Sequence, residues 1–249
     1  MSELSYGMRG PEVGNLQRFL NTTLFAPNLV VDEDFGSKTR VAVAAFQSRE
    51  QIREKAGTFG PLTRKRALQL GFIPFVPARN YTVVLTKPRS IDLIVVHTME
   101  SPDKPDTAER VAAWFAGPNA PKASAHYCLD VDSTIQQVRD RDVAWHAKGA
   151  NHNGIGIEHA GYAKQTAKEW KNAYNQAMLM RSAQLVARLC KEHNIPIERR
   201  TADELKSKMR GICGHVDVTN AFSGGKGHWD PGPNWIWDDY LALIEANPG

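Results

Sequence analysis

The sequence contains no long hydrophobic run and no large excess of charge of one sign. Its apolar runs, such as residues 91–96, are far shorter than the roughly 18 unbroken apolar residues that indicate a membrane-spanning helix. The 31 Lys and Arg residues nearly balance the 27 Asp and Glu residues, and the net charge of +4 is too small to indicate nucleic acid as a partner. We therefore expect neither a membrane span nor nucleic-acid binding. A weakly basic surface suits an anionic polymer such as the bacterial cell wall, but +4 is equally ordinary surface variation.

The beginning of the sequence also lacks a secretory signal, because no basic segment is followed by a continuous apolar stretch. We therefore expect synthesis in the cytoplasm without a signal peptide. The three cysteines, Cys128, Cys190 and Cys213, are odd in number and widely spaced, with no CxxC pair. This pattern disfavours a disulfide framework and predicts small buried side chains.

We expect the protein to be a monomer.

The overall composition predicts a folded chain. A hydrophobic content of 42% with 23% charged residues is typical of globular proteins and unlike disordered ones. A length of 249 residues allows one large domain, or a small domain followed by a medium one. Length alone does not distinguish these two possibilities.

A short motif occurs twice in the first 72 residues. Residues 35–39 read Phe-Gly-Ser-Lys-Thr, and residues 59–63 read Phe-Gly-Pro-Leu-Thr. Each copy precedes a segment whose apolar residues fall on one helical face, and the glycines are expected to start these helices. A further helix is expected to begin at Pro11, where the missing backbone N–H of proline is harmless. The pattern therefore predicts a small bundle of three short helices.

A proline-rich segment separates this region from the rest of the chain. Pro74, Pro77 and Pro88 forbid a continuous helix and favour an extended path, so residues 73–90 are expected to be a linker and lead-in. Beyond it, the apolar patterns predict strands within residues 91–97, 124–140 and 155–161, and helices at residues 107–115, at about 169–193 and from Trp235 onward. Strands that alternate with helices predict an α/β domain over residues 91–249.

Two histidines and one carboxylate in the second half form a candidate metal site. His97 follows directly after an apolar strand, at the point where the sheet ends and a site can open, while His215 and Asp230 lie in segments rich in glycine or proline. Two histidines and a carboxylate suit a catalytic zinc ion, because they leave the fourth tetrahedral position for water. A single histidine at a strand end is more often structural, and the spacing of the three residues proves nothing by itself.

Residues 6–20, 34–47 and 57–68 together resemble the peptidoglycan-binding domain of many cell-wall hydrolases. The resemblance implies a non-catalytic module, residues 1–72, that holds an enzyme on bacterial peptidoglycan and raises its local concentration there. Within the repeated motif, the phenylalanines are expected to be core residues rather than ligand contacts. The alternative is a helical cap that only stabilises a catalytic domain.

Six short segments of the second half occur in the order found in the type 2 N-acetylmuramoyl-L-alanine amidase family. They are residues 95–101, 124–130, 144–147, 155–161, 214–218 and 228–235. This resemblance covers residues 91–243, and it implies a mixed central sheet flanked by helices, preceded here by the small three-helix domain. It also implies that the catalytic domain, residues 91–249, binds one Zn²⁺ through His97, His215 and Asp230. Members with neither Cys nor Asp at the last ligand position tend to bind peptidoglycan without cutting it, so Asp230 favours an enzyme.

Two further residues are expected to act in catalysis. Glu158 lies in a strand of otherwise apolar and glycine residues, where an ionisable group is costly unless it has a partner, so we expect it to be the general base. An outward-facing strand glutamate is the alternative. His228 occupies the position where the recycling amidases of the family carry a catalytic Lys, and it is expected to stabilise the oxyanion or to donate a proton. The catalytic Tyr of the lysozyme-like members is absent, because Ala125 precedes His126.

The resemblance also implies a wall of the substrate groove. Trp145 and His146 are expected to contact sugar or stem peptide, with packing inside the domain as the alternative. Asn153 is expected either to hydrogen-bond the substrate or only to turn the chain before Gly154.

Together the two resemblances imply a peptidoglycan hydrolase of the phage endolysin kind. Such an enzyme cleaves the amide bond between N-acetylmuramic acid and L-alanine of the stem peptide with a zinc-activated water. Without a secretion signal, it needs a holin-like pore or cell breakage to reach the wall. Two alternatives stay open: a recognition protein that binds peptidoglycan without hydrolysis, and a cytoplasmic amidase that recycles muropeptides. The peptidoglycan-binding module disfavours the second, since soluble fragments need no anchor.

Overall fold

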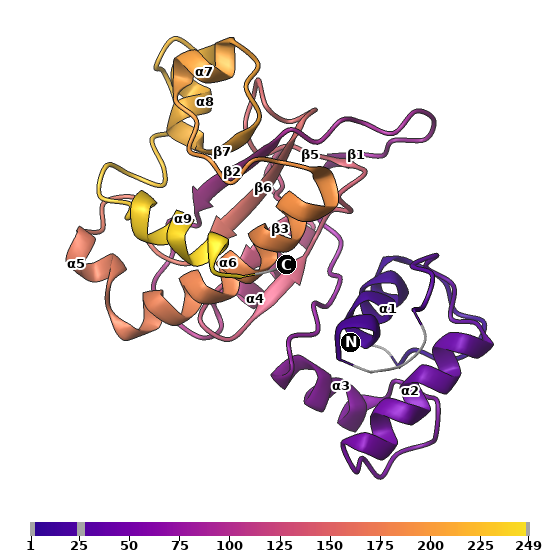
Figure 1. Cartoon of the computed structure of the whole chain (residues 1–249). Coiled ribbons are helices and arrows are strands. Elements are labelled where there is room, and N and C mark those ends of the chain that lie inside the picture. The colour runs from indigo at the N-terminus through magenta and orange to yellow at the C-terminus, as the bar shows by residue number, and fades with distance from the viewer. Residues whose placement is uncertain (1–2, 24–27, 248–249) are drawn as a thin grey trace. The chain divides into compact units, whose positions relative to one another are not determined.

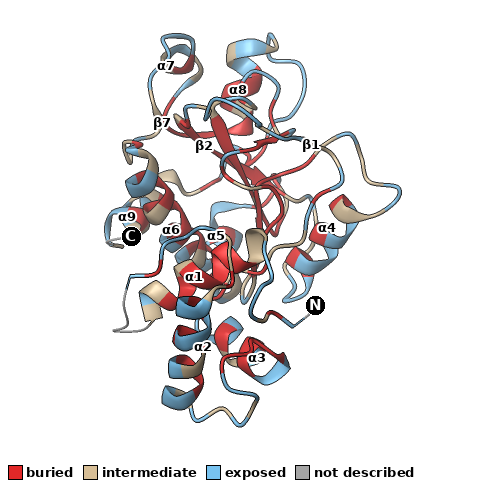
Figure 2. Ribbon diagram, turned by 90° about the vertical axis from the view of Figure 1, so that its right-hand side faces the viewer, coloured by how far each residue is buried: buried red, intermediate tan, exposed pale blue. Residues whose placement is uncertain are grey.

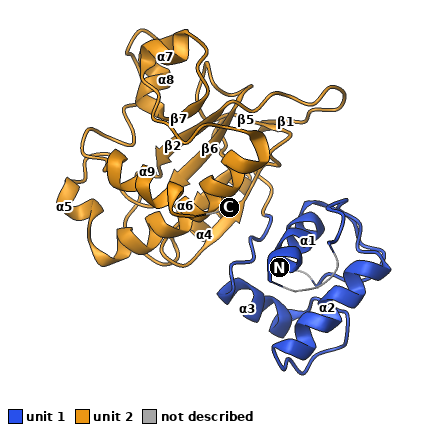
Figure 3. Ribbon diagram, viewed as in Figure 1, with its two compact units in different colours: residues 1–75 blue, residues 76–249 orange. Residues whose placement is uncertain are grey.

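The computed structural model describes residues 3–23 and 28–247, which form two compact units. Unit 1 is Met1–Phe75 and unit 2 is Val76–Gly249 (Figure 3). Each unit has its own hydrophobic core and its own secondary-structure elements, which Figure 1 labels in chain order.

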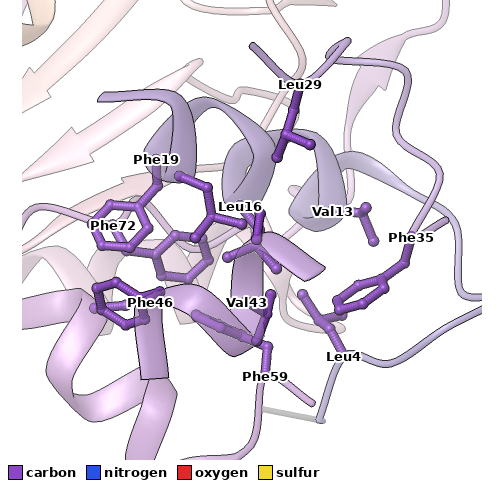
Figure 4. Packing of buried hydrophobic residues seen from close by; sticks show 13 residues of the cluster. Leu4, Val13, Leu16, Phe19, Leu29, Phe35, Val43, Phe46, Phe59 and Phe72 are labelled. Carbon is purple, nitrogen blue, oxygen red and sulfur yellow. The ribbon is translucent and has the colours of Figure 1, made fainter. Parts of the chain in front are cut away.

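Unit 1 contains the three helices expected from its sequence, α1 (Pro11–Thr23), α2 (Ser37–Arg49) and α3 (Pro61–Gln69). Gly36 and Gly60 are the N-cap residues of α2 and α3, which confirms that each copy of the repeated motif starts a helix. The phenylalanines of the motif and of α2 are fully buried in the core between the helices (Figure 4): Phe35, Phe46 and Phe59. Their expected core position is confirmed.

The repeat in the sequence corresponds to a repeated hydrogen-bond pattern around two buried glutamines. Gln17 of α1 donates to the Thr39 hydroxyl of the first motif at 3.2 Å, and its carbonyl accepts from two backbone N–H groups. Gln47 of α2 donates to the Thr63 hydroxyl of the second motif at 2.9 Å, and its carbonyl accepts from the N–H of Gly57. Each glutamine therefore satisfies backbone groups of the turn that leads into the next helix.

Unit 2 is built around a five-stranded mixed sheet with the order β4-β3-β6-β2-β7. Its strands are β2 (Leu93–Thr98), β3 (Tyr127–Leu129), β4 (Thr134–Gln136), β6 (Gly154–His159) and β7 (Gly211–Gly214). Strand β2 runs parallel to both β6 and β7, β3 runs parallel to β6, and β4 is antiparallel to β3. A separate two-stranded sheet pairs β1 (Tyr81–Thr82) with β5 (Val143–Ala144). The expected mixed sheet is thus confirmed.

Helices cover both faces of this sheet (Figures 1 and 2). They are α4 (Thr107–Ala116), α5 (Ala167–Trp170), α6 (Ala173–His193), α7 (Ala202–Lys206), α8 (His215–Phe222) and α9 (Trp237–Glu245). Successive strand residues point to opposite faces, so Cys128 packs with α4 while the neighbouring Tyr127 hydroxyl meets Arg188 of α6. The buried strands lie between these two layers.

One expectation about element boundaries differs from the structure. The helix expected at about residues 169–193 is two helices, because Asn172 interrupts it and caps α6 by accepting a hydrogen bond from the N–H of Asn175. Residues 73–90 were expected to be a linker and lead-in, and unit 2 begins near the start of this segment, at Val76, whose N–H donates to the carbonyl of Gln136. The extended path is present, but most of it packs on unit 2.

The expectation that the cysteines are small buried side chains is confirmed. All three cysteines are buried and none forms a disulfide. Within residues 3–23 and 28–247, no helix combines the length and the apolar character that crossing a bilayer requires.

We predict that Gln47→Ala destabilises unit 1, because it leaves the N–H of Gly57 and the carbonyl of Thr58 without their buried partner. Each such group costs about 1–3 kcal/mol. Hydrogen exchange of the unit 1 amides measures the effect on the free energy of opening. Gln69→Ala is the matched control, because Gln69 is exposed at the end of α3, and it should change this free energy by less than about 0.5 kcal/mol. Equal exchange rates in both variants would show that the hydrogen bonds of Gln47 do not stabilise unit 1.

Candidate metal and catalytic site

Three parallel strands end at the same edge of the sheet and bring the candidate site together. In the register of β2 with β6, His97 is opposite Glu158, and side chains of paired residues on neighbouring strands point to the same face. In the register of β2 with β7, Val96 is opposite Gly214, so His215 follows directly at the first turn of α8. The sequence positions of these residues are far apart, and strand pairing alone makes them neighbours.

Asp230 joins this edge from the loop between α8 and α9. Its carbonyl accepts a hydrogen bond from the N–H of Val216 at 2.9 Å, which ties the loop to the start of α8. Its carboxylate lies between the two histidines, 3.2 Å from Nδ1 of His97 and 3.2 Å from Nδ1 of His215. All three side chains are buried, and their ligand atoms lie within 4.8 Å of one another. The structure therefore gathers the three residues predicted as metal ligands.

The electrostatics of this group set its protonation. Burial, together with the charge of His215, lowers the pKa of His97 to about 4, so its imidazole is neutral near neutral pH. Burial alone would raise the pKa of Asp230, but hydrogen bonds from His215 and His97 outweigh it and hold this pKa well below its usual value. A neutral imidazole beside an ionised carboxylate is the state in which such side chains bind metals.

Glu158 lies beside the group without a compensating partner. Its Oε2 atom is buried and accepts no hydrogen bond from any described residue. Burial, and after it the negative charges of Asp230 and Glu100, raise the pKa of Glu158 well above its usual value. A carboxylate that is costly to keep ionised is a strong proton acceptor when it does ionise. The geometry thus fits the base predicted from the sequence.

His228 stands at the mouth of the site. Its ring stacks on that of His215 with centroids 4.4 Å apart and planes at 12°, and its Nδ1 lies 3.7 Å from a carboxylate oxygen of Asp230. The side chain is 72% exposed, so its ring can meet a group that enters from solvent.

His146 approaches the metal group from behind His97. Its Nδ1 lies 3.1 Å from Nε2 of His97, and its own Nε2 lies 3.4 Å from the carbonyl of Gly154. Gly156 makes room for this ring, since a Cβ at that position would come within 2.4 Å of it. Both ring nitrogens of His146 therefore face protein atoms. No pattern in the sequence predicts this contact, because His146 lies 49 positions after His97, in a loop that follows β5.

The other two residues predicted to bind substrate, Trp145 and Asn153, lie in different parts of the structure. Trp145 lines the cleft, and its indole N–H donates to the Thr82 hydroxyl at 3.0 Å. Asn153 does not reach the cleft. It precedes the first residue of β6, at the end of the sheet opposite Glu158, and its side chain points to Asp92 and lines a different hollow.

All the other predicted site residues line one cleft of about 340 Å³. The sequence prediction missed part of its wall, formed by Glu100, Trp114 and Ser124. Trp114 could have been noticed, because a tryptophan on the polar side of an amphipathic helix is unusual, and it is 53% exposed. Glu100 and Ser124 are ordinary surface or loop residues by sequence pattern, and only the fold places them here.

Comparison with known proteins agrees with this geometry. The family model described as N-acetylmuramoyl-L-alanine amidase matches residues 87–233, and one described as a peptidoglycan binding domain matches residues 9–66. N-acetylmuramoyl-L-alanine amidase A of Achromobacter lyticus is 30% identical over 174 residues, which cover 68% of this chain and 90% of that protein. The structure of Staphylococcus aureus hydrolase AmiA in complex with its ligand is 16% identical with a TM-score of 0.50, covering 67% of this chain and 80% of AmiA.

The likeness to AmiA shows the fold, and the sequence matches show the family. The amidase family model spans more than half of the 249 residues and includes the whole candidate metal group. The curated relative reaches 30% identity across two thirds of the chain. By the extent of these two matches, the chain belongs to the N-acetylmuramoyl-L-alanine amidase family.

Proposed function

We propose that this protein is a zinc-dependent amidase that hydrolyses the bond between N-acetylmuramic acid and L-alanine in peptidoglycan. The observation that carries the proposal is the buried group of His97, His215 and Asp230 with Glu158 beside it, inside the region that matches the amidase family. The name of the Achromobacter lyticus relative describes the same bond.

The three candidate ligands fit zinc by their donor atoms. Two imidazole nitrogens and a carboxylate oxygen converge within 4.8 Å, which is a donor set of catalytic zinc sites that keep one position open. Zinc held there supplies Lewis-acid chemistry, which polarises the amide carbonyl and lowers the pKa of water in the cleft.

Glu158 is the proposed general base. Its buried, unpartnered oxygen can accept a proton from the attacking water, and its raised pKa lets it hold that proton and then donate it to the amide nitrogen as the C–N bond breaks. His228 is proposed to stabilise the oxyanion by donating an N–H from the mouth of the cleft, where its exposed ring can meet the carbonyl of the substrate. Trp145, on the cleft wall, is proposed to contact sugar or stem peptide.

His146 is proposed to orient His97. The hydrogen bond from His97 to Asp230 belongs to the tautomer that carries its proton on Nδ1. In the other neutral tautomer, His97 donates its Nε2–H to Nδ1 of His146, and His146 donates its Nε2–H to the carbonyl of Gly154, so that Nδ1 of His97 carries no proton and faces the metal position. A ligand histidine commonly donates its second N–H in this way, and the partner fixes the ring. The substrate contact expected for His146 stays a prediction, since this residue also lines the cleft.

Unit 1 supports an action on polymeric peptidoglycan. Residues 9–66 match the peptidoglycan binding domain family, and a binding unit raises the local concentration of the catalytic unit on an insoluble polymer. This favours a lytic role of the endolysin kind over the recycling of soluble muropeptides. We propose that the enzyme reaches the wall after release through a holin-like pore or by cell breakage.

Digestion of purified peptidoglycan followed by mass spectrometry tests the reaction. We expect free stem peptides with an N-terminal L-alanine and glycan strands that keep the lactyl group, and no such products after zinc is removed with a chelator. New reducing ends or cleaved peptide crosslinks without free stem peptides would rule out the amidase activity. Binding to peptidoglycan without any product would favour the recognition protein.

Substitutions should separate metal binding from turnover. We expect Asp230→Ala to lose both zinc and activity, and Glu158→Gln to keep zinc while turnover falls by about 10²–10⁴. Metal analysis and rates of peptide release measure the two effects. Glu245→Gln is the matched control, because Glu245 is exposed on α9 away from the cleft. A Glu158→Gln enzyme with the wild-type rate would exclude the proposed base.

The orienting role of His146 predicts a graded loss of zinc affinity. His146→Leu removes the hydrogen-bond acceptor of His97 and should weaken zinc binding by about 10–100-fold. His146→Asn can keep an acceptor near the position of Nδ1 and should lose much less. Chelator competition measures the zinc Kd, with His152→Leu as the control, since His152 is exposed. Unchanged zinc affinity in a folded His146→Leu protein would contradict this role.

A further inference from the structure

A second hollow, of about 310 Å³, lies between α4 and the segment that follows β2. Its lining includes Met99, Ser101, Arg110, Val111 and Trp114. Three of these residues, Met99, Val111 and Trp114, also line the catalytic cleft. The two hollows therefore adjoin along α4, and a ligand longer than one sugar or one amino acid can extend from the cleft into the second hollow.

Arg110 gives this second hollow its charge. Among the described residues that line the two hollows, Arg110 is the only Lys or Arg. No acidic side chain lines the second hollow. Its side chain is exposed, and within the described chain no ion pair or hydrogen bond engages its guanidinium. Glu109, the residue before it, accepts from the Ser133 hydroxyl, and Asp103 accepts from Asn175. Asp106, one helical turn earlier, forms no ion pair with Arg110 within the described chain. The guanidinium is thus available to a ligand.

The catalytic cleft has the opposite character. Its wall carries the carboxylates of Glu100, Glu158 and Asp230, of which Asp230 is assigned to the metal. Glu100 would repel an acidic group that entered the cleft. A substrate with a neutral part and an anionic part is therefore favoured when its neutral part occupies the cleft and its anionic part reaches Arg110.

The substrate of the proposed reaction has this division of charge. On the muramoyl side, the lactyl carboxyl group is consumed in the scissile amide and carries no charge. On the other side, the peptide that begins with L-alanine ends in a free carboxylate wherever that end is not consumed in a crosslink. The two oxygens of a carboxylate match the planar fork of an arginine.

We propose that the second hollow is a carboxylate subsite, in which Arg110 binds an acidic group of the stem peptide. The peptide side of the scissile bond then lies along α4, past the exposed indole of Trp114, while the bond itself sits over the metal group. This inference rests on the proposed amidase function, and it adds a direction and a charge preference to the binding of the substrate.

Kinetics with matched synthetic substrates test the subsite. The probes are N-acetylmuramoyl peptides of two and three residues that begin with L-alanine, each prepared as a C-terminal carboxylate and as a carboxamide. For at least one length, the wild type should show a KM about tenfold lower for the carboxylate than for the carboxamide. In Arg110→Gln this ratio should approach one, and in Arg110→Lys, which keeps the charge without the fork, it should be intermediate. The matched control is Arg141→Gln, because Arg141 is exposed and lines neither hollow, and it should keep the wild-type ratio.

The possible outcomes distinguish this proposal from the function on which it rests. If the wild type cleaves both kinds of substrate with equal KM, or if Arg110→Gln keeps the wild-type ratio, the subsite is wrong while the amidase function stands. If the wild type cleaves none of the probes or purified peptidoglycan, the function is wrong and the subsite fails with it. A loss of kcat in Arg110→Gln with the KM ratio unchanged also overturns the proposal, because a binding subsite acts on KM.

Discussion

The register of β2 against its two parallel neighbours is the constraint on which the site depends. It sets His97 opposite Glu158 on one side and leads directly into His215 on the other. A shift of one residue in either pairing would turn these side chains to the opposite face of the sheet. Because β2 is buried along its whole length, its apolar residues hold this register, and the energy that folds the domain also positions the candidate metal ligands.

The two buried carboxylates at this edge differ in how their burial is compensated. Asp230 is buried between two histidines, which hold its pKa low, and it completes the donor set. Glu158 has no such partner, and its cost is consistent with a carboxylate kept for proton transfer. Gly156 contributes by its small size, since it admits the ring of His146 behind His97. Residues other than the three candidate ligands therefore also help to position the site.

Much of the fold followed from local patterns in the sequence. The glycines of the repeat start α2 and α3, and the apolar segment before His97 is β2. The break at Asn172 was missed because the apolar periodicity continues through it, and the cap depends on one side-chain hydrogen bond. The packing of Val76 on unit 2 depends on a distant strand, which prolines alone do not reveal.

The candidate site was less accessible from sequence than the fold. His97, His215 and Asp230 were identified through the order of motifs in a family, whereas their spacing carried no information. Asn153 and Glu158 are close in sequence but lie at opposite ends of β6. Asn153 precedes the first residue of this strand and therefore lies away from the cleft, while Glu158 is near its last residue. The contact of His146 with His97, and the position of Arg110 in a hollow beside the cleft, arise only from tertiary packing.

The central claim is that zinc binds to two histidines and one carboxylate at the end of β2. X-ray absorption at the zinc edge of the purified, zinc-loaded protein tests it most directly, because nitrogen and oxygen ligands at about 2.0–2.2 Å differ clearly from sulfur at about 2.3 Å. We predict one zinc per chain, two imidazole ligands and no sulfur. A sulfur ligand, or a protein that takes up no zinc, would contradict the account.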